Sequence, residues 1–221
     1  MCREPVACDA VAETNTDDRL VWIDLEMTGL EVDRDVIVEI ACIVTDSNLV
    51  ALDDGIQLVV HQAVEVLARM DDFVRTMHTK SGLLDEIPIA PIDTAAAEKE
   101  VLAYIQKHVT LARAAPMCGN SIGMDRRFLA KYMPELDNYV HYRSVDVSSF
   151  KELARRWYPA IYRKRPGKAE EHRALGDIQE SIEELRYYRE QLLPPLGAKP
   201  RTPAFAPDAD AAPDGSAEQP A

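Results

Sequence analysis

The first third of the chain carries three short apolar runs that are separated by polar turns. Leu20–Glu26 is short and mostly apolar, which is typical of a buried strand, and Val36–Thr45 is a second run rich in β-branched residues. Ile56–His61 is a third run, and Asp53–Gly55 before it favours a hairpin turn. We therefore expect three consecutive strands that pair as an antiparallel meander.

Further along the chain, helical and strand-like patterns alternate. Val101, Ile105 and Val109 recur at helical spacing behind Asp93, which can cap a helix. The same reasoning predicts helices over Ala95–His108, Asp125–Met133, Ser148–Trp157 (capped by Ser148 or Ser149) and Arg173–Gln191, strands over Pro116–Gly119 and Tyr139–Val145, and a polar loop over 159–171. This order of elements predicts an α/β fold in which helices flank a mixed sheet.

The two ends of the chain differ from its middle. Residues 194–221 hold seven of the 14 prolines and only two large apolar residues, Leu196 and Phe205. Such a composition cannot bury a core, so we expect a disordered tail rich in Pro, Ala and Asp. Residues 1–18 are polar and acidic and predict a disordered extension, which leaves one folded domain over residues 19–193.

Composition and charge exclude several classes of protein. The net charge of −13 disfavours a protein that coats long duplex nucleic acid through a broad basic surface. No apolar stretch is long enough to predict a membrane-spanning helix. The four cysteines show no CxxC spacing, and the first residues lack the pattern of a secretory signal. We therefore expect a cytoplasmic protein.

Two acidic residues, Asp24 and Glu26, interrupt the first apolar run. Side chains alternate along a strand, so positions 24 and 26 point to the same face. Two carboxylates held close together are costly unless a cation neutralises them, and oxygen ligands suit Mg²⁺ or Mn²⁺. The alternative is a sheet edge that carries two solvated acids.

Three later residues could complete such a site. Asp125 follows a turn-rich segment, but it is also an acid of the kind favoured at the start of a helix. Asp177 lies among apolar residues of the last helix, where an isolated acid is usually a paired surface residue. His172 precedes it by five residues and therefore cannot share its face of one regular helix. Taken alone, His172 is a capping or surface residue.

Three motifs together resemble a known family, the oligoribonucleases. Trp22–Leu30 resembles the first exonuclease motif of that family, and Cys118–Phe128 resembles the second. His172–Ile178 resembles the third, the His-x4-Asp motif of the histidine-type DEDD exonucleases. Further similar stretches are His141–Arg143, Asp146–Ser148 and Lys151–Trp157. The resemblance extends from about Leu20 to Leu192 and leaves out both tails.

The resemblance implies a ribonuclease-H-like sheet, antiparallel in its first three strands and parallel afterwards. It also implies 3′→5′ hydrolysis of short RNA, chiefly 5′-phosphorylated dinucleotides, to mononucleotides. Asp24, Glu26, Asp125 and Asp177 match the four carboxylates that hold two divalent ions, Mg²⁺ or Mn²⁺. His172 matches the general base, a role that suits an imidazole because it titrates near neutral pH.

Other residues match the family's substrate contacts. Leu30 matches a wedge between the two bases, Phe73 stands where many members have a stacking tryptophan, and His78 matches a nearby contact. The residues that match the cap on the substrate 5′-phosphate are Ser121, Tyr142, Arg143 and Ser148. Some of these come from the second subunit in the family, which implies a homodimer. Without the resemblance, Leu30 and Phe73 fit core packing and Arg143 fits a surface ion pair.

Two alternatives to a dinucleotide-selective enzyme remain. One is a 3′→5′ exonuclease that trims longer RNA or DNA ends. The other is an inactive nucleotide-binding or scaffold protein that has kept the fold, although the presence of all five candidate catalytic residues argues against it. Gly176 also departs from the alanine or aspartate that usually precedes the last metal ligand, and glycine weakens a helix.

Overall fold

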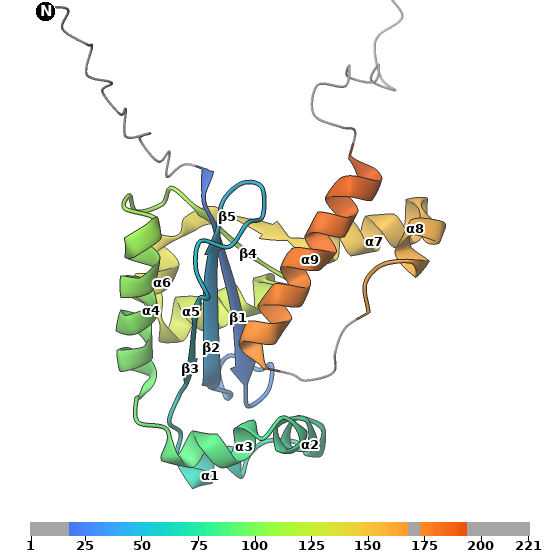
Figure 1. Ribbon diagram of the computed structural model, residues 1–221. Helices are drawn as coiled ribbons and strands as arrows, with labels where there is room; N and C mark the ends of the chain where they lie inside the picture. Colours follow the sequence, from blue (N-terminus) through green and yellow to red (C-terminus); the bar gives the residue numbers. More distant parts are fainter. Residues whose placement is uncertain (1–17, 168–172, 194–221) are drawn as a thin grey trace, which may run out of the picture.

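The computed structural model describes residues 18–167 and 173–193, and its centre is a five-stranded sheet (Figure 1). The strand order is β3-β2-β1-β4-β5, which places β1 in the middle. The strands are β1 (Leu20–Met27), β2 (Ile37–Thr45), β3 (Ile56–Val59), β4 (Pro116–Gly119) and β5 (His141–Asp146). The first three pair antiparallel, and β4 and β5 run parallel to β1. Both the α/β class and the predicted mixed topology are confirmed.

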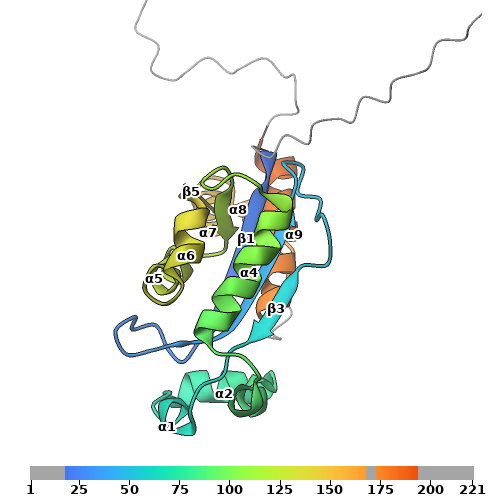
Figure 2. The same cartoon turned by 90° about the vertical axis from the view of Figure 1, so that its left-hand side faces the viewer.

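Helices cover both faces of this sheet (Figures 1 and 2). On one face lie α4 (Thr94–His108), α5 (Gly123–Tyr132) and α6 (Pro134–Tyr139), and on the other lie α7 (Val147–Trp157) and α9 (Ala174–Leu192). Val21, Ile23 and Leu25 of β1 pack into the core under α4, whereas Trp22 packs into the core under α9. The alternation along the strand therefore points positions 24 and 26 to the α9 face.

A third group of elements lies beyond one end of the sheet (Figure 1). It comprises α1 (Val64–Leu67), α2 (Asp72–Lys80), α3 (Leu83–Glu86) and the 3₁₀ turn η2 (Ile87–Ile89). A small core around Val38, Leu83 and Ile87 holds these elements against β2. The sequence pattern predicts no element here, because helices of four to nine residues are too short for a clear apolar period.

Several predicted boundaries were wrong for identifiable reasons. The expected strand at Tyr139 begins instead at His141, because Pro134 opens the short helix α6 that ends at Tyr139. Asp146, rather than Ser148 or Ser149, caps α7, since its side chain accepts the Ser148 N–H. Part of the loop expected over 159–171 is the helix α8 (Pro159–Arg163), which also opens with a proline.

The two ends predicted to be disordered lie almost entirely outside the described residues, as does the segment 168–172. Among the helices that are described, none is both long and apolar enough to cross a membrane.

Candidate active site

Three carboxylates from two elements meet on the α9 face of the sheet. Asp24 and Glu26 lie on the central strand β1, and Asp177 lies in the first turn of α9. One ligand oxygen from each can be chosen so that all three lie within 4.8 Å of one another. A solvated sheet edge is excluded as an explanation, because β1 has neighbours on both sides and Glu26 is buried.

The electrostatics of Glu26 indicate which kind of ligand this cluster favours. Burial, followed by the charges of Asp177, Glu39 and Asp125, raises the pKa of Glu26 to about 8, against the smaller opposing effect of Arg173. A buried carboxyl surrounded by other carboxyls is stabilised by a cation, and a donor set made only of carboxylate oxygens suits a hard divalent ion. The residues at this position therefore fit a metal centre.

Asp125 lies beside this cluster without belonging to the group of three. It is buried in the first turn of α5, and its Oδ1 accepts the Leu25 N–H of β1 at 3.0 Å. Burial raises the pKa of Asp125 to about 7, although hydrogen bonds from two backbone N–H groups oppose the shift. Its charge acts on Glu26, so the structure brings all four predicted carboxylates to one end of β1.

The sheet opens where these residues gather. The parallel pairing between β1 and β4 covers only Val21 and Trp22, so the Leu25 N–H lies beyond it and Asp125 can take it. The carboxyl ends of β1, β4 and β5 all face this opening. Ligands of open α/β sheets bind outside the carboxyl ends of parallel strands, at a point where the strand order reverses. The four carboxylates therefore lie at the position in the sheet where ligands of such folds bind.

A buried ion-pair network fixes the start of α9 and was missed by the sequence analysis. Glu39 of β2 is fully buried and accepts hydrogen bonds from Arg173 Nε at 3.0 Å and Nη2 at 2.8 Å. Its other oxygen accepts the Ala174 N–H at 2.9 Å, and Glu86 of α3 binds the same guanidinium. Arg173 directly follows His172, which lies outside the described residues. The sequence does carry a signal for this network, because Glu39 interrupts an apolar strand just as Glu26 does.

The predicted base-binding residues line a pocket of about 460 Å³ beside Glu26. Leu30 is 63% exposed and Phe73 is 78% exposed, so neither is a core residue. Leu30 belongs to the loop after β1, and Phe73 to α2 on the other side of the pocket. The two side chains are therefore placed to contact a ligand that reaches the carboxylates.

His78 of α2 is not on the pocket surface. It is fully buried, and its Nε2 lies 2.9 Å from the Met27 carbonyl oxygen. Its Nδ1 lies 3.9 Å from Glu26 Oε2. In this structure His78 connects α2 to the end of β1, next to one of the acids.

Two of the residues predicted to cap a phosphate are linked through Asp146. Its Oδ1 accepts the N–H of Ser121 at 2.9 Å, and also the N–H and the hydroxyl of Ser148, at 2.9 and 2.6 Å. Ser121 has a φ of +59°, a left-handed conformation that costs free energy outside glycine. Asp146 therefore holds together the loop after β4 and the start of α7, although the sequence analysis did not assign it to the site.

The other two predicted cap residues lie on the edge strand β5. Tyr142 and Arg143 are both exposed, and the Arg143 guanidinium lies 5.4 Å from the centre of the Tyr142 ring. Within residues 18–167 and 173–193, no acidic side chain pairs with Arg143. The surface ion pair considered as its alternative is therefore absent from the described part of the chain.

Comparisons with known proteins agree with this geometry. A family model described as Exonuclease, of the RNase T type, matches residues 21–185. An oligoribonuclease from Corynebacterium glutamicum is 58% identical over 173 residues, which is 78% of this chain and 79% of the relative. An oligoribonuclease from Rhodococcus jostii is 54% identical over 178 residues, covering 80% and 89% of the two chains.

Solved structures show the same fold at much lower sequence identity. Escherichia coli exonuclease I in complex with a dA16 oligonucleotide superposes with a TM-score of 0.61 and 13% identity, covering 79% of this chain. Exonuclease I of Methylocaldum szegediense gives 0.56 and 16%, also over 79% of this chain. The chain spans only 41% of the length of each of these structures. Because its likeness to the two oligoribonucleases instead covers most of both sequences, the chain belongs to the oligoribonuclease family of exonucleases.

Proposed function

We propose that the protein hydrolyses short oligoribonucleotides from the 3′ end, chiefly 5′-phosphorylated dinucleotides, and releases nucleoside 5′-monophosphates. The observation that carries the proposal is the convergence of four carboxylates beside a short pocket that exposes Leu30 and Phe73. The names of the relatives support the substrate class, since they are oligoribonucleases at more than half identity. Completing RNA degradation is the process that such an activity serves.

The exonuclease family depends on divalent metal ions, and the acidic cluster fits them. In the proposed site, Asp24, Glu26, Asp125 and Asp177 hold two ions, Mg²⁺ or Mn²⁺. When bound, such ions activate a water molecule and stabilise the charge that develops on a phosphate oxygen. The raised pKa of Glu26 means that this chain's own carboxyl must release a proton before it can serve as a ligand.

His172 is proposed as the general base that accepts the proton of the attacking water. This role rests on the His-x4-Asp motif that it forms with Asp177. Arg173, the next residue, is held by Glu39 and Glu86, so the chain is anchored one residue after the base. Exchange of His172 for alanine lowers kcat by about 10²–10⁴-fold if it is the base, and leaves metal binding intact.

The remaining residues are proposed to bind the two ends of the substrate and so to select its length. Leu30 and Phe73 contact the two bases, since an exposed aromatic face can stack a base. Arg143, with Ser121, Tyr142 and Ser148, binds the 5′-phosphate, a task that suits the planar fork of a guanidinium. The resemblance gives His78 a substrate contact, but its side chain is fully buried, so we propose that it acts by holding α2 against the end of β1 through the Met27 carbonyl oxygen.

We also propose a homodimer in the cytoplasm. Support for the dimer comes from the edge strand β5 and the helix that follows it, where Tyr142 and Trp157 are 72% and 65% exposed. These two exposed aromatic side chains are candidate contacts for a second subunit. Light scattering on the full chain tests the subunit number directly.

The deciding experiment is product analysis on 5′-phosphorylated RNAs of two to seven nucleotides, with Mg²⁺, Mn²⁺ or a chelator. We expect dinucleotides to be cut fastest and the chelator to stop the reaction. Equal rates per end on a dinucleotide and a 20-mer would instead indicate an enzyme that trims longer RNA or DNA. Calorimetry that shows dinucleotide binding without turnover in either metal would indicate an inactive binding protein.

A further inference from the structure

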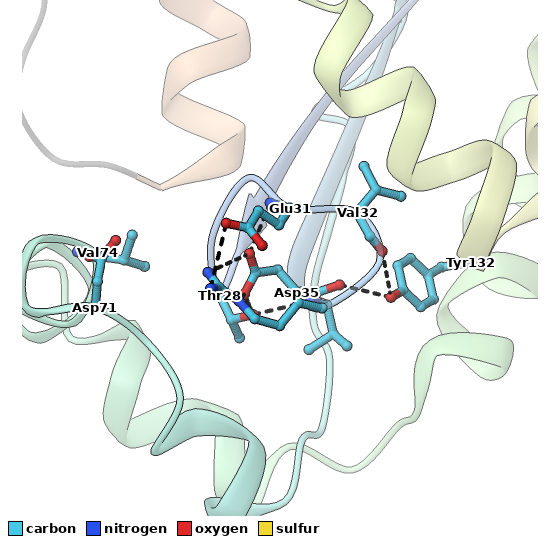
Figure 3. A network of polar contacts seen from close by, with 9 residues as sticks. Thr28, Glu31, Val32, Asp35, Asp71, Val74 and Tyr132 are labelled. Atoms are coloured by element: carbon cyan, nitrogen blue, oxygen red, sulfur yellow. Dashed lines mark hydrogen bonds and ion pairs between the residues drawn. The ribbon is translucent and has the colours of Figure 1, made fainter.

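The loop that carries Leu30 is unusually well fixed for an exposed connection. It joins β1 to β2 over residues 28–36, and its Asp35 side chain is buried at its centre (Figure 3). A buried carboxylate is costly unless it is hydrogen-bonded, so its partners indicate what it stabilises.

Asp35 binds the loop to itself at several points. Its Oδ1 accepts the Thr28 hydroxyl at 3.2 Å, and its Oδ2 accepts the Glu31 N–H at 2.9 Å. Arg34 donates to both oxygens at 3.3–3.4 Å. Thr28 Oγ1 in turn accepts the Val36 N–H at 3.0 Å, which closes the two ends of the loop. The backbone on both sides of Leu30 is thereby held by one carboxylate.

A glycine makes room for this carboxylate. A Cβ atom at Gly29 would lie 2.4 Å from Asp35 Oδ2 and 2.7 Å from its Cγ, closer than packed atoms approach. The Asp35 side chain therefore sits against the backbone immediately before Leu30, and only a residue without a side chain fits there.

The loop is also tied to the helix that carries Asp125. Tyr132 of α5 places its hydroxyl 3.0 Å from the Val32 carbonyl oxygen and 2.8 Å from the Asp35 carbonyl oxygen (Figure 3). The opposite wall of the pocket comes from α2, whose N-cap Asp71 accepts the Val74 N–H. The Asp35 contacts lie within the loop and to α5, whereas α2 is held by its own cap and by His78 at Met27, so a shift of the loop changes the width between Leu30 and Phe73.

We propose that Asp35 is a positioning residue that determines substrate length, because it fixes the Leu30 wall of the pocket at the width that two nucleotides fill. This inference rests on the proposed function. The carboxylates of the reaction lie on β1, α5 and α9, outside the loop, so loosening the loop weakens binding of a dinucleotide more than it slows the chemistry. A seven-nucleotide RNA offers further bases and phosphates that can bind outside this pocket, so we expect its affinity to fall less.

The test compares Asp35→Ala with Asp33→Ala on a 5′-phosphorylated dinucleotide and a seven-nucleotide RNA in Mn²⁺. Asp33 is a matched control, since it lies in the same loop but is fully exposed, and its one ion pair among the described residues is with Lys131. For Asp35→Ala we expect the KM of the dinucleotide to rise about 10-fold or more, with kcat within about threefold of the wild type. The preference for the dinucleotide over the seven-nucleotide RNA should fall as well, by no more than that factor, and Asp33→Ala should change neither value.

Further variants keep the test informative if Asp35→Ala folds poorly. Tyr132→Phe removes only the hydroxyl that binds the two loop carbonyls, and Gly29→Ala displaces the carboxylate without removing it. Both should shift KM in the same direction, and Asp35→Asn should restore part of the loss because it keeps one acceptor oxygen. Hydrogen exchange of the loop amides should accelerate in Asp35→Ala and not in Asp33→Ala.

The outcomes separate this inference from the proposed function. If the wild type prefers the dinucleotide and Asp35→Ala keeps that preference, the role of Asp35 is wrong and the function stands. If KM rises while loop exchange is unchanged, Asp35 does not act by positioning. If the wild type shows no preference for the dinucleotide, the proposed function itself fails.

Discussion

Glu26 and Glu39 are paired in the β1–β2 ladder, yet the two carboxylates have opposite electrostatic surroundings. Glu39 accepts hydrogen bonds from the side chains of Arg173 and Gln57 and from the Ala174 N–H, so its charge is compensated by the chain itself. Glu26 is surrounded by further acids, and its pKa rises to about 8 because of burial and those neighbours.

This difference in surroundings separates a structural buried acid, Glu39, from a functional one, Glu26. A buried charge that has its own cation and hydrogen bonds stabilises one arrangement of the chain, here the start of α9. A buried acid among other acids is retained at a cost to the fold, and perturbed groups of this kind cluster at functional sites. Three experiments test this contrast, and a fourth tests the helix turn that carries Asp177.

The largest expected effect comes from the uncompensated cluster. Asp24→Ala removes one of the three converging carboxylates, so turnover should be lost even in saturating Mn²⁺ while the fold is kept. Steady-state kinetics and circular dichroism measure both, and the exposed Asp54→Ala is the control. Retention of more than about a tenth of the wild-type kcat would contradict the metal-ligand role of Asp24.

The compensated cluster should respond through stability instead. In Glu39→Gln the new amide NH₂ faces a donor in either orientation, because Arg173 points at one oxygen and Ala174 N–H at the other. Breaking such a buried pair costs about 3 kcal/mol of unfolding free energy, measurable by denaturant titration. Metal-free Glu26→Gln should lose no stability. Equal losses of unfolding free energy in Glu39→Gln and Glu26→Gln would contradict the distinction between the two carboxylates.

A smaller effect concerns the pH dependence of the metal-free protein. Folded Glu26 and Asp125 have pKa values of about 8 and 7, above their ordinary values of 4.5 and 3.8, so the native state holds more protons than the unfolded state between these limits. Stability should therefore fall as pH rises from about 5 to 8, by at most about 1.4 kcal/mol per pH unit for each group.

Thermal unfolding in chelator across this pH range measures that fall. Glu26→Gln should show a shallower slope than the wild type, because one of the two groups no longer titrates. Added Mn²⁺ should flatten or reverse the slope, since it binds the deprotonated carboxylates. A metal-free protein whose Tm rises steadily over this range would contradict the raised pKa values.

The smallest effect is expected at Gly176, one residue before Asp177. A Cβ at this position meets nothing within 4 Å, so the glycine serves no steric purpose in the described part of the chain. Gly176→Ala should stabilise α9 by up to about 1 kcal/mol, measured by denaturant titration, with kcat unchanged. A loss of stability or activity would mean that this turn needs the freedom of glycine.

Local sequence patterns predicted where the strands lie and that Asp24 and Glu26 share one face of β1. The period of two along β1 placed Asp24 and Glu26 on one face, and the structure adds Asp177 to them. Asp125 was ambiguous from its neighbours alone, because an acid at a helix start has a local explanation. Its hydrogen bond to Leu25 N–H crosses 100 positions of sequence, and no local pattern reports such a contact.

The residues that position the site were harder to find than the acids themselves. Asp35, Glu39 and Asp146 act through partners that tertiary packing supplies, and each looks like an ordinary loop or strand acid in the sequence. The segment with Phe73 and His78 was given no structure, because its helices are short and their core is small. The role of His172 stays a prediction from its motif.

The hydroxyl of Ser148 has a single hydrogen, and in this structure it is directed to Asp146. Any incoming group must therefore compete with a carboxylate for that hydrogen. In the proposed site, a doubly ionised 5′-phosphate is a better acceptor for this hydrogen than an uncharged 5′-hydroxyl group. We therefore expect the Asp146–Ser148 hydrogen bond to make binding selective for a charged 5′ terminus.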